Sequence, residues 1–536
     1  MSYNNPSQWL NTICAANGDR TAICFKDQKV SYFELGQHTN RIANILKELG
    51  LKKGEKIGLL LPNCPEFVYF LYGAVKVGVI SACMATTFRG ESLEYLINSA
   101  DSKVMVVSTE LEDAFLKIRD QLPGVEKIVW YPEFPKGREQ HQVNEFSFNQ
   151  LFSHAKASLD ITVQVSDADP MLFLHSSGTT GRPKWIIQTF AFLLEQGRFF
   201  ADFSGIVPSD RVYDPLPMFH GNSQMFMISG SLYANATMVI GTRFSASKLW
   251  EEVRYHKATV LVLHFTPIEF MKKQPVQAGE TDHLIRVCFP ADREFMERFR
   301  IPMGISGYGS IDAGIVCYEK FRLPFTESYL PNDDKRLYSV GGYPNRNVEI
   351  AVVDKEGRAL PPGKVGEIVV RGLKPHVISE GYYNRSEKTL DAFRNFWFHT
   401  NDMGFIDREG RLHYSHRSAE GINIKGEWVD VPGLENVIRA HPKALDCVVV
   451  RIKDEMVGSE VKAWIELREG EVLKEEEIVA WCEGKIAHYM IPRYVEFIPE
   501  LPRLAGTEKV ARFALEAQGV GNSWDREKAG YKLVRS

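Results

Sequence analysis

Cysteine motifs, long apolar runs and an excess of one charge sign are all missing from this sequence. Its eight cysteines are scattered from Cys14 to Cys482 without a Cys-x-x-Cys pair or a His/Cys cluster. This spacing argues against a zinc site or a redox dithiol and favours reduced, buried thiols. The most apolar region, residues 57–85, is too polar for a membrane span, because it is interrupted by Pro62, Asn63, Pro65, Glu66 and Lys76.

The net charge of −4 is small for a chain of 536 residues. It gives no support for binding to nucleic acid or to an anionic membrane surface. The first residues, MSYNNPSQWLNTI, have no basic stretch followed by an apolar core, so we expect no signal peptide. These absences together indicate a cytoplasmic protein.

The whole chain of 536 residues is long enough for two or more domains. Helix and strand patterns alternate through its first part. Ser31 and Glu34 form a capping-box signature, and an apolar repeat at helical spacing then runs to Gly50. The apolar pattern also predicts strands at 56–61, 104–107, 171–174, 260–265 and 368–370 and a helix at 91–100. This order predicts a large N-terminal layered α/β domain with parallel-rich sheets.

Beyond about residue 415 the pattern is that of a smaller α+β domain of about a hundred residues. Strands are expected at 444–452, 462–467 and 494–498, and a helix is expected at 475–488.

A loop rich in glycine and hydroxyl groups, His175-Ser-Ser-Gly-Thr-Thr-Gly-Arg-Pro-Lys184, follows one predicted strand. Strand ends of α/β proteins are where ligands bind, and backbone amides, hydroxyls and cations together suit a polyphosphate. The candidate phosphate-binding residues are Ser176, Ser177, Gly178, Thr179, Thr180, Gly181 and Lys184. Composition alone also allows a plain surface loop, and the spacing matches neither the Walker pattern nor G-x-G-x-x-G.

The whole ten-residue string resembles the phosphate loop of the adenylate-forming superfamily, which comprises acyl-CoA ligases, peptide-synthetase adenylation domains and luciferases. The resemblance covers nearly the whole chain, in the expected order, and is strongest to the crotonobetaine/carnitine-CoA ligase-like group. The matching segments are residues 54–63, 217–220, 307–312, 366–372, 381–383, 398–402, 417 and 501–512.

The resemblance implies an ATP site. Tyr308 would stack on adenine, Asp402 would bind the ribose hydroxyls, and Arg417 would assist it. Mg²⁺ would shield the phosphates, with Asp312 as the candidate metal ligand.

The resemblance also implies two catalytic residues. His220 belongs to the segment that gates the carboxylate pocket in the family. Lys509 would stabilise the negative charge that develops when the carboxylate attacks the α-phosphate of ATP.

The motifs also depart from the family pattern. Ile311 replaces a threonine, and Asp312 replaces a glutamate. Near Lys509, Leu504 replaces a threonine and Glu508 replaces a glycine. These departures leave two alternatives open, a working enzyme and a nucleotide-binding member with impaired catalysis.

The implied reaction has two steps. ATP and a small-molecule carboxylic acid give an acyl-adenylate and pyrophosphate, and coenzyme A then takes the acyl group as a thioester. The family pattern implies domains at 1–417 and 420–536, the second mobile about a hinge near Glu420. Transfer to a carrier protein or an amine is the alternative second step. A homodimer is favoured only because symmetric pairs are the commonest assembly.

Overall fold

The computed structural model describes residues 5–136, 144–159, 163–175, 183–325, 340–417, 422–424, 427–429, 431–454, 458–486, 490–503 and 510–533. The chain forms two compact units. The first unit comprises residues 1–178, 182–350 and 370–398, and the second comprises residues 179–181, 351–369 and 399–536. The domain boundary expected between residues 417 and 420 stays a prediction.

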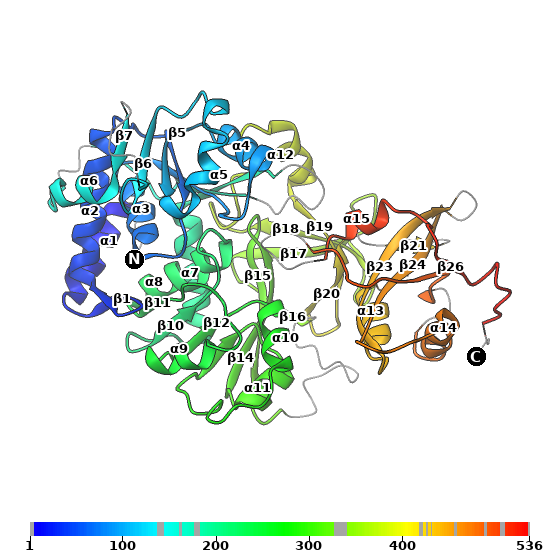
Figure 1. Ribbon diagram of the computed structural model, residues 1–536. Coiled ribbons are helices and arrows are strands. Elements are labelled where there is room, and N and C mark those ends of the chain that lie inside the picture. Colours follow the sequence, from blue (N-terminus) through cyan, green and yellow to red (C-terminus); the bar gives the residue numbers. More distant parts are fainter. Residues whose placement is uncertain are drawn as a thin grey trace. The chain divides into compact units, whose positions relative to one another are not determined.

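The first unit contains a largely parallel sheet (Figure 1). Its strands are β3 (Lys56–Leu60), β4 (Ile80–Cys83), β5 (Ser102–Ser108), β6 (Lys127–Tyr131), β7 (Glu145–Ser147), β8 (Pro170–His175) and β9 (Trp185–Thr189). They lie in the order β7-β6-β5-β3-β4-β8-β9. Every pairing is parallel except the antiparallel pair of β8 and β9.

Helices cover both faces of this sheet. They are α1 (Pro6–Asn17), α2 (Tyr32–Glu48), α3 (Pro65–Lys76), α4 (Gly90–Ser99), α5 (Glu112–Leu116), α6 (Phe148–His154) and α7 (Phe190–Ser204), with short 3₁₀ turns η1 (Thr109–Leu111) and η2 (Arg119–Gln121). Leu96 of α4 and Phe115 of α5 pack against Met105 and other residues of one face. Residues of α2 and α3 pack with Leu59 on the opposite face. Burial on both faces explains why these strands are continuous apolar runs.

A second sheet of the first unit carries the candidate site. Its strands are β1 (Thr21–Phe25), β2 (Gln28–Ser31), β10 (Arg211–Asp214), β11 (Thr237–Ile240), β12 (Val260–Val262), β13 (Val287–Phe289), β14 (Met303–Ser310), β15 (Gly314–Arg322) and β16 (Val340–Pro344). Their order is β16-β15-β14-β13-β12-β10-β11-β1-β2, with a parallel centre and antiparallel margins.

The remaining helices of the first unit follow these strands. They are the π-helix η3 (Ser223–Gly230), α8 (Ser231–Ala234), α9 (Leu249–Tyr255), α10 (Phe265–Lys273), α11 (Arg293–Phe299), α12 (Ser386–Ala392) and the 3₁₀ turn η5 (Arg394–Phe396).

Strands at the junctions of the two units are β17 (Val348–Val353), β18 (Gly366–Gly372) and β19 (Phe398–Ile406), and β20 (Leu412–Arg417) belongs to the second unit. They lie in the order β17-β18-β19-β20.

The rest of the second unit is a small α+β assembly. Its elements are β21 (Ile422–Ile424), β22 (Glu427–Val429), α13 (Val431–Arg439), β23 (Ala444–Asp454), β24 (Gly458–Leu467), α14 (Glu475–Cys482), β25 (Tyr494–Phe497), α15 (Arg512–Glu516) and β26 (Trp524–Asp525). The sheet order β23-β24-β25-β26 leaves β23 at an edge. The mixed α/β class and the separate small unit confirm the predicted fold.

Local signals were reliable where they depended on neighbours in the chain. The Ser31 hydroxyl accepts from the Glu34 amide and the Glu34 carboxylate accepts from the Ser31 amide, so the capping box is present. Two predicted elements are too long. The strand expected at 260–265 stops at Val262, because His264 caps α10, and the helix expected at 475–488 stops at Cys482, before Gly484 with φ +73°.

Candidate active site

The two ends of the predicted phosphate loop are adjacent in space. His175 of β8 and Trp185 of β9 are Cα partners in an antiparallel pair. The candidates Ser176, Ser177, Gly178, Thr179, Thr180 and Gly181 lie outside the described residues. Lys184 is described, and its Nζ lies 3.5 Å from the centre of the Tyr382 ring. This cation–π contact holds the lysine at the base of the loop.

The Tyr308 segment forms the turn between β14 and β15. The Ser310 hydroxyl accepts from the Ala313 amide at 3.0 Å, and Gly314 has a φ of +68° that favours glycine. This bond shows the Ser310 hydroxyl closing the turn. Tyr308 near the end of β14 and Asp312 in the turn are therefore both presented from a defined backbone.

Two side chains and one backbone amide from other segments fix this turn. The buried Gln196 of α7 accepts from the Ile315 amide at 2.7 Å, and the Gln188 amide group donates to the Ile311 carbonyl. The Asp312 carbonyl accepts from the Ser379 amide at 2.7 Å. Three separate segments thus hold a turn that the sequence marked only by its motif.

Ile311 has a packing role at the site. A Cβ added to Gly221 would lie within 3.0 Å of the Ile311 Cγ2 atom, closer than real Cβ atoms approach. The aliphatic side chain that replaces the family's threonine therefore occupies the space beside Gly221. The hydroxyl is lost, and the Cγ2 methyl group of Ile311 packs against the His220 segment.

His220 lies in a turn between β10 and the π-helix η3. Its amide donates to the Pro217 carbonyl at 3.0 Å, and its ring lies 6.3 Å from the His264 ring at an interplanar angle of 77°. The Asn222 side-chain nitrogen lies 3.3 Å from His264 Nε2. π-helical turns are frequent at functional sites, and here one begins at Ser223, shortly after the histidine.

Two buried polar residues support the His220 turn. Asp214 accepts from the Leu216 amide at 2.8 Å, and burial raises the pKa of the Asp214 carboxyl to about 7. Asn63 donates to the Leu216 carbonyl at 2.8 Å and accepts from the Met218 amide at 2.9 Å. A carboxyl and an amide from distant segments therefore position the turn.

A cavity of about 210 Å³ opens between the His220 segment and Tyr308. It is lined by Phe203, Asn222, Met225, Phe226, Leu263, His264, Phe265, Phe289, Pro290, Ser306, Gly307, Tyr308, Gly309, Ser310, Ile311, Gly314, Ile315 and Tyr318. None of these lining residues is an Asp, Glu, Lys or Arg. Sequence reasoning missed His264 as a site residue, and its position just after the end of a strand was the available signal.

The predicted ribose motif forms a separate arrangement in the second unit. Asp402 of β19 and Arg417 of β20 are Cα partners, so they are opposite each other in an antiparallel pair. The Asp402 amide donates to the Thr400 hydroxyl at 3.0 Å, and Glu367 accepts from the Asn401 amide at 3.2 Å. The predicted partnership of Asp402 and Arg417 is thus consistent with their register.

Lys509 and Glu420 lie outside the described residues. No group of three or more His, Cys, Asp and Glu side chains suited to a metal ion occurs among the residues that the structure describes. Nor is any helix in the described ranges long and apolar enough to cross a membrane.

Comparison with family models identifies the chain. The model described as AMP-binding enzyme matches residues 10–383, and that described as AMP-binding enzyme C-terminal domain matches residues 433–508. The chain belongs to the AMP-binding enzyme family. The resemblance inferred from the phosphate loop and its companion motifs is confirmed.

Relatives of this AMP-binding enzyme include ligases that use coenzyme A. The chain is 31% identical over 517 residues to a crotonobetaine/carnitine--CoA ligase of Salmonella enteritidis, covering 93% of this chain and 96% of the relative. A solved anthranilate CoA ligase in complex with anthranoyl-AMP matches with a TM-score of 0.83 and 25% identity, covering 96% of this chain and 97% of the other. The ATP-bound MatB structure from Rhodopseudomonas palustris shares the fold, with a TM-score of 0.81 and 23% identity over 96% of this chain and 99% of MatB.

The family and these relatives make the protein an ATP-dependent acid–CoA ligase that acts through an acyl-adenylate. Its substrate is a small-molecule carboxylic acid, and ATP and CoA are its co-substrates.

Proposed function

We propose that this ligase activates a compact carboxylic acid whose acyl body is uncharged, with an aryl acid fitting best. The observation that carries the proposal is the cavity beside Tyr308, with its volume of about 210 Å³ and its lining without charged side chains. An apolar cavity of about 150 Å³ is enough to bind benzene. One ring with its carboxylate therefore fits the available volume, whereas a long fatty acyl chain does not.

The charges of the lining narrow the substrate class further. A second carboxylate in the acid would be buried without a lysine or arginine partner, and burying an unpaired charge is costly. A quaternary ammonium group would find aromatic faces but no carboxylate. Among those rings, Phe203 and Tyr318 stack on each other at 4.5 Å, and Phe226 stacks on Phe200 at 4.8 Å. These stacked pairs leave fewer open faces for a cation and favour a neutral body.

The carboxylate of the acid is proposed to lie near His220. Asn222, two residues further along the chain, lines the cavity. His220 and the amide group of Asn222 are the polar groups suited to orient the carboxylate for attack on the α-phosphate. Holding the two reacting groups together is itself a large part of catalysis in such a step. Lys509 is proposed to stabilise the added negative charge.

Each part of the nucleotide has its own proposed binding residues. The loop of Ser176 to Lys184 would hold the phosphates, Tyr308 would stack on adenine, and Asp402 with Arg417 would bind the ribose.

Mg²⁺ fits the donors that are present, because this ion needs only one or two carboxylates and completes its shell with phosphate and water. Asp312 is the carboxylate proposed to hold it. When bound, the ion would shield the phosphate charges.

The second step is proposed to follow rotation of the C-terminal domain, residues 420–536, about a hinge near Glu420. Two further proposals concern the location of the protein in the cell and its oligomeric state. The eight cysteines are buried and none forms a disulfide, which favours a reducing cytoplasm. A homodimer is proposed, and light scattering of the purified protein measures it.

The test of the substrate class is pyrophosphate release with ATP and Mg²⁺, with and without CoA. The acids are benzoate, 2-aminobenzoate, carnitine, crotonobetaine, malonate and palmitate. We expect the two aryl acids to give the highest kcat/KM, with thioester formed only when CoA is present. Higher kcat/KM for crotonobetaine or carnitine would contradict the uncharged-body proposal, and the same holds for malonate. Preference for palmitate would contradict the size limit.

A further inference from the structure

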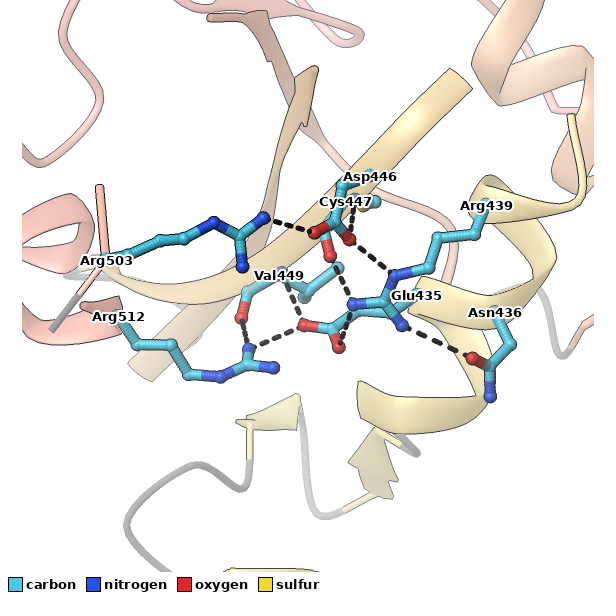
Figure 2. A network of polar contacts seen from close by, with 8 residues as sticks. All are labelled: Glu435, Asn436, Arg439, Asp446, Cys447, Val449, Arg503 and Arg512. Carbon is cyan, nitrogen blue, oxygen red and sulfur yellow. Dashed lines mark hydrogen bonds and ion pairs between the residues drawn. The ribbon is translucent and has the colours of Figure 1, made fainter. Parts of the chain in front are cut away.

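Two arginines flank the segment that contains Lys509, and each is paired with a carboxylate (Figure 2). Before the segment, the Arg503 guanidinium lies 3.2 Å from the Asp446 carboxylate. After it, the Arg512 guanidinium lies 2.6 Å from the Glu435 carboxylate. Glu435 belongs to α13 and Asp446 to β23, so both carboxylates are carried by regular elements of the second unit.

The two ends of the segment also meet each other. Arg503 and Val510 form an isolated antiparallel bridge, and the Ala511 amide donates to the Pro502 carbonyl at 2.7 Å. The described residues on either side of positions 504–509 therefore meet at one place on the second unit. Lys509 is bonded directly to Val510, one of the two residues of that bridge.

Arg439 joins the two carboxylates into one network, shown in Figure 2. Its guanidinium lies 2.7 Å from Asp446 and 3.1 Å from Glu435. The ionic contacts therefore run without a break from Arg503 through Asp446, Arg439 and Glu435 to Arg512. The described residues at both ends of the segment are therefore tied to one network, in which Glu435 is buried and Asp446 is partly buried.

The network also completes the open edge of β23. The Val449 amide donates to Glu435 at 2.8 Å, and the Val449 carbonyl accepts from Arg512 at 2.8 Å. Edge strands leave such backbone groups without a strand partner, and here side chains supply the bonds. Arg512 is thus held by a carboxylate and by the strand itself.

Burial makes the pairing necessary. Glu435 is only 3% exposed. Burial alone would raise the pKa of Asp446, but Arg439, the Cys447 amide and Arg503 together hold that pKa below its usual value. A buried carboxylate such as Glu435 is strongly destabilised when it loses one of its partners, so Arg512 has little freedom to leave.

We propose that Glu435, with Asp446, is a positioning residue for the adenylation step, acting through Arg512 and Arg503 on the segment that carries Lys509. This inference rests on the proposed role of Lys509 in adenylation. Because the network fixes where that segment begins and ends, cutting it displaces the lysine from the developing charge. Displacement by about 1 Å is enough to lower a catalysed rate by about 100-fold.

The experiment measures the two half-reactions separately on the full chain. The probes are the acid that gives the highest pyrophosphate release in the panel above and its synthetic acyl-adenylate. Glu435→Gln keeps the size of the side chain and removes its charge. We expect single-turnover adenylation to fall by about 10- to 100-fold, while thioester formation from the preformed adenylate and CoA stays within about 2-fold.

A double variant shows whether Glu435 acts through the lysine. Glu435→Gln combined with Lys509→Ala is expected to adenylate no more slowly than Lys509→Ala alone, because residues that act as a unit are non-additive. An additive further loss would overturn the proposal. An equal fall of both half-reactions in Glu435→Gln, or no fall in either, would overturn it as well.

Two more variants make the result interpretable. Glu496→Gln cuts the Lys462–Glu496 pair, 2.8 Å apart with Lys462 fully buried, on the same sheet but outside the network of Glu435 and Asp446. It is expected to lower Tm without separating the two half-reactions. Arg503→Gln, whose side chain is 38% exposed, replaces Glu435→Gln if that variant does not fold, and the same split is expected.

The single variant Lys509→Ala separates the proposed role of Lys509 in adenylation from the proposed positioning role of Glu435. Normal adenylation by Lys509→Ala would refute the proposed role of the lysine and with it this inference. Slow adenylation by Lys509→Ala beside normal adenylation by Glu435→Gln would refute the positioning network only.

Discussion

Gly221 and Ile311 are in direct contact across the candidate site, although they lie ninety residues apart in the chain. The contact leaves no space for a methyl group, since a Cβ on Gly221 would come within 3.0 Å of Ile311 Cγ2. Ile311 is a departure from the family motif, and its Cγ2 methyl group, which a threonine would also carry, makes this contact. It connects the turn that follows Tyr308 and β14 with the turn that carries His220.

We expect Gly221→Ala to destabilise the protein and slow the enzyme. Overpacking costs roughly 1–3 kcal/mol of unfolding free energy, and the displaced His220 turn should lower kcat/KM for the acid by about 10-fold. Urea unfolding and steady-state kinetics measure the two effects. When Ile311→Ala is combined with Gly221→Ala, it should relieve the overlap and partly restore stability and kcat/KM. Gly124→Ala is the control, because no atom lies within 4 Å of its added Cβ, and failure of Ile311→Ala to rescue would refute the contact.

Asp214 should make stability depend on pH. Burial raises its pKa to about 7, whereas the unfolded carboxyl titrates near 3.8. Between these pKa values the folded state binds the proton and the unfolded state does not. The contribution of this proton to the free energy of unfolding is therefore complete below about pH 4 and is lost as pH rises through 7. Asp214→Asn cannot titrate. Urea unfolding should therefore show a wild-type advantage over this variant that is larger at pH 5 than at pH 8, and parallel pH curves for the two proteins would contradict the buried carboxyl.

The cation–π contact of Lys184 should matter for ATP. Its Nζ lies 3.5 Å from the centre of the Tyr382 ring, and such contacts are worth about 0.5–2 kcal/mol. Tyr382→Leu removes the aromatic face and should raise the KM for ATP by about 3- to 30-fold, as measured by pyrophosphate release. Tyr382→Phe keeps the face and should resemble the wild type. If Tyr382→Phe is as impaired as Tyr382→Leu, the phenol hydroxyl and not the ring supports the site.

The assignment of Asp402 to the ribose predicts selectivity for the sugar. A charged hydrogen bond to the 2′-hydroxyl is worth about 1.5–3 kcal/mol, so the wild type should prefer ATP to 2′-deoxy-ATP by about 10- to 100-fold in kcat/KM. Asp402→Ala should lose most of this preference while it loses activity with ATP. A variant that is slower with both nucleotides but keeps the ratio would show that Asp402 does not contact the 2′-hydroxyl.

Much of the fold could be predicted because its signals are local. The Ser31–Glu34 capping box and the apolar strands that became β3, β5, β8 and β23 depend on neighbours within a few residues. The same reasoning overran at Phe265 and beyond Cys482, where periodicity continued but the backbone turned. His264 and Gly484 set those ends, and the apolar pattern did not mark them.

The candidate site was predicted only as a set of motif positions. The order of the motifs that contain Tyr308, His220, Asp402 and Lys184 predicted the family of the chain, and the comparison confirmed that family. It could not show that Asn222 contacts His264, or that Asp214 and Asn63 support the His220 turn. These contacts join residues that have no fixed spacing in the chain.

The sequence by itself determined the family, the layered α/β class and the identities of the chemical groups, because each depends on short motifs and on the period of apolar residues. Tertiary structure alone decided that the cavity beside Tyr308 is small and uncharged and that Ile311 fills the space against Gly221. It also decided that Glu435 meets Arg512, 77 residues further along the chain. The physical reason is the same in each case: cavity volume, burial and charge pairing arise between distant segments, and only packing brings those segments together.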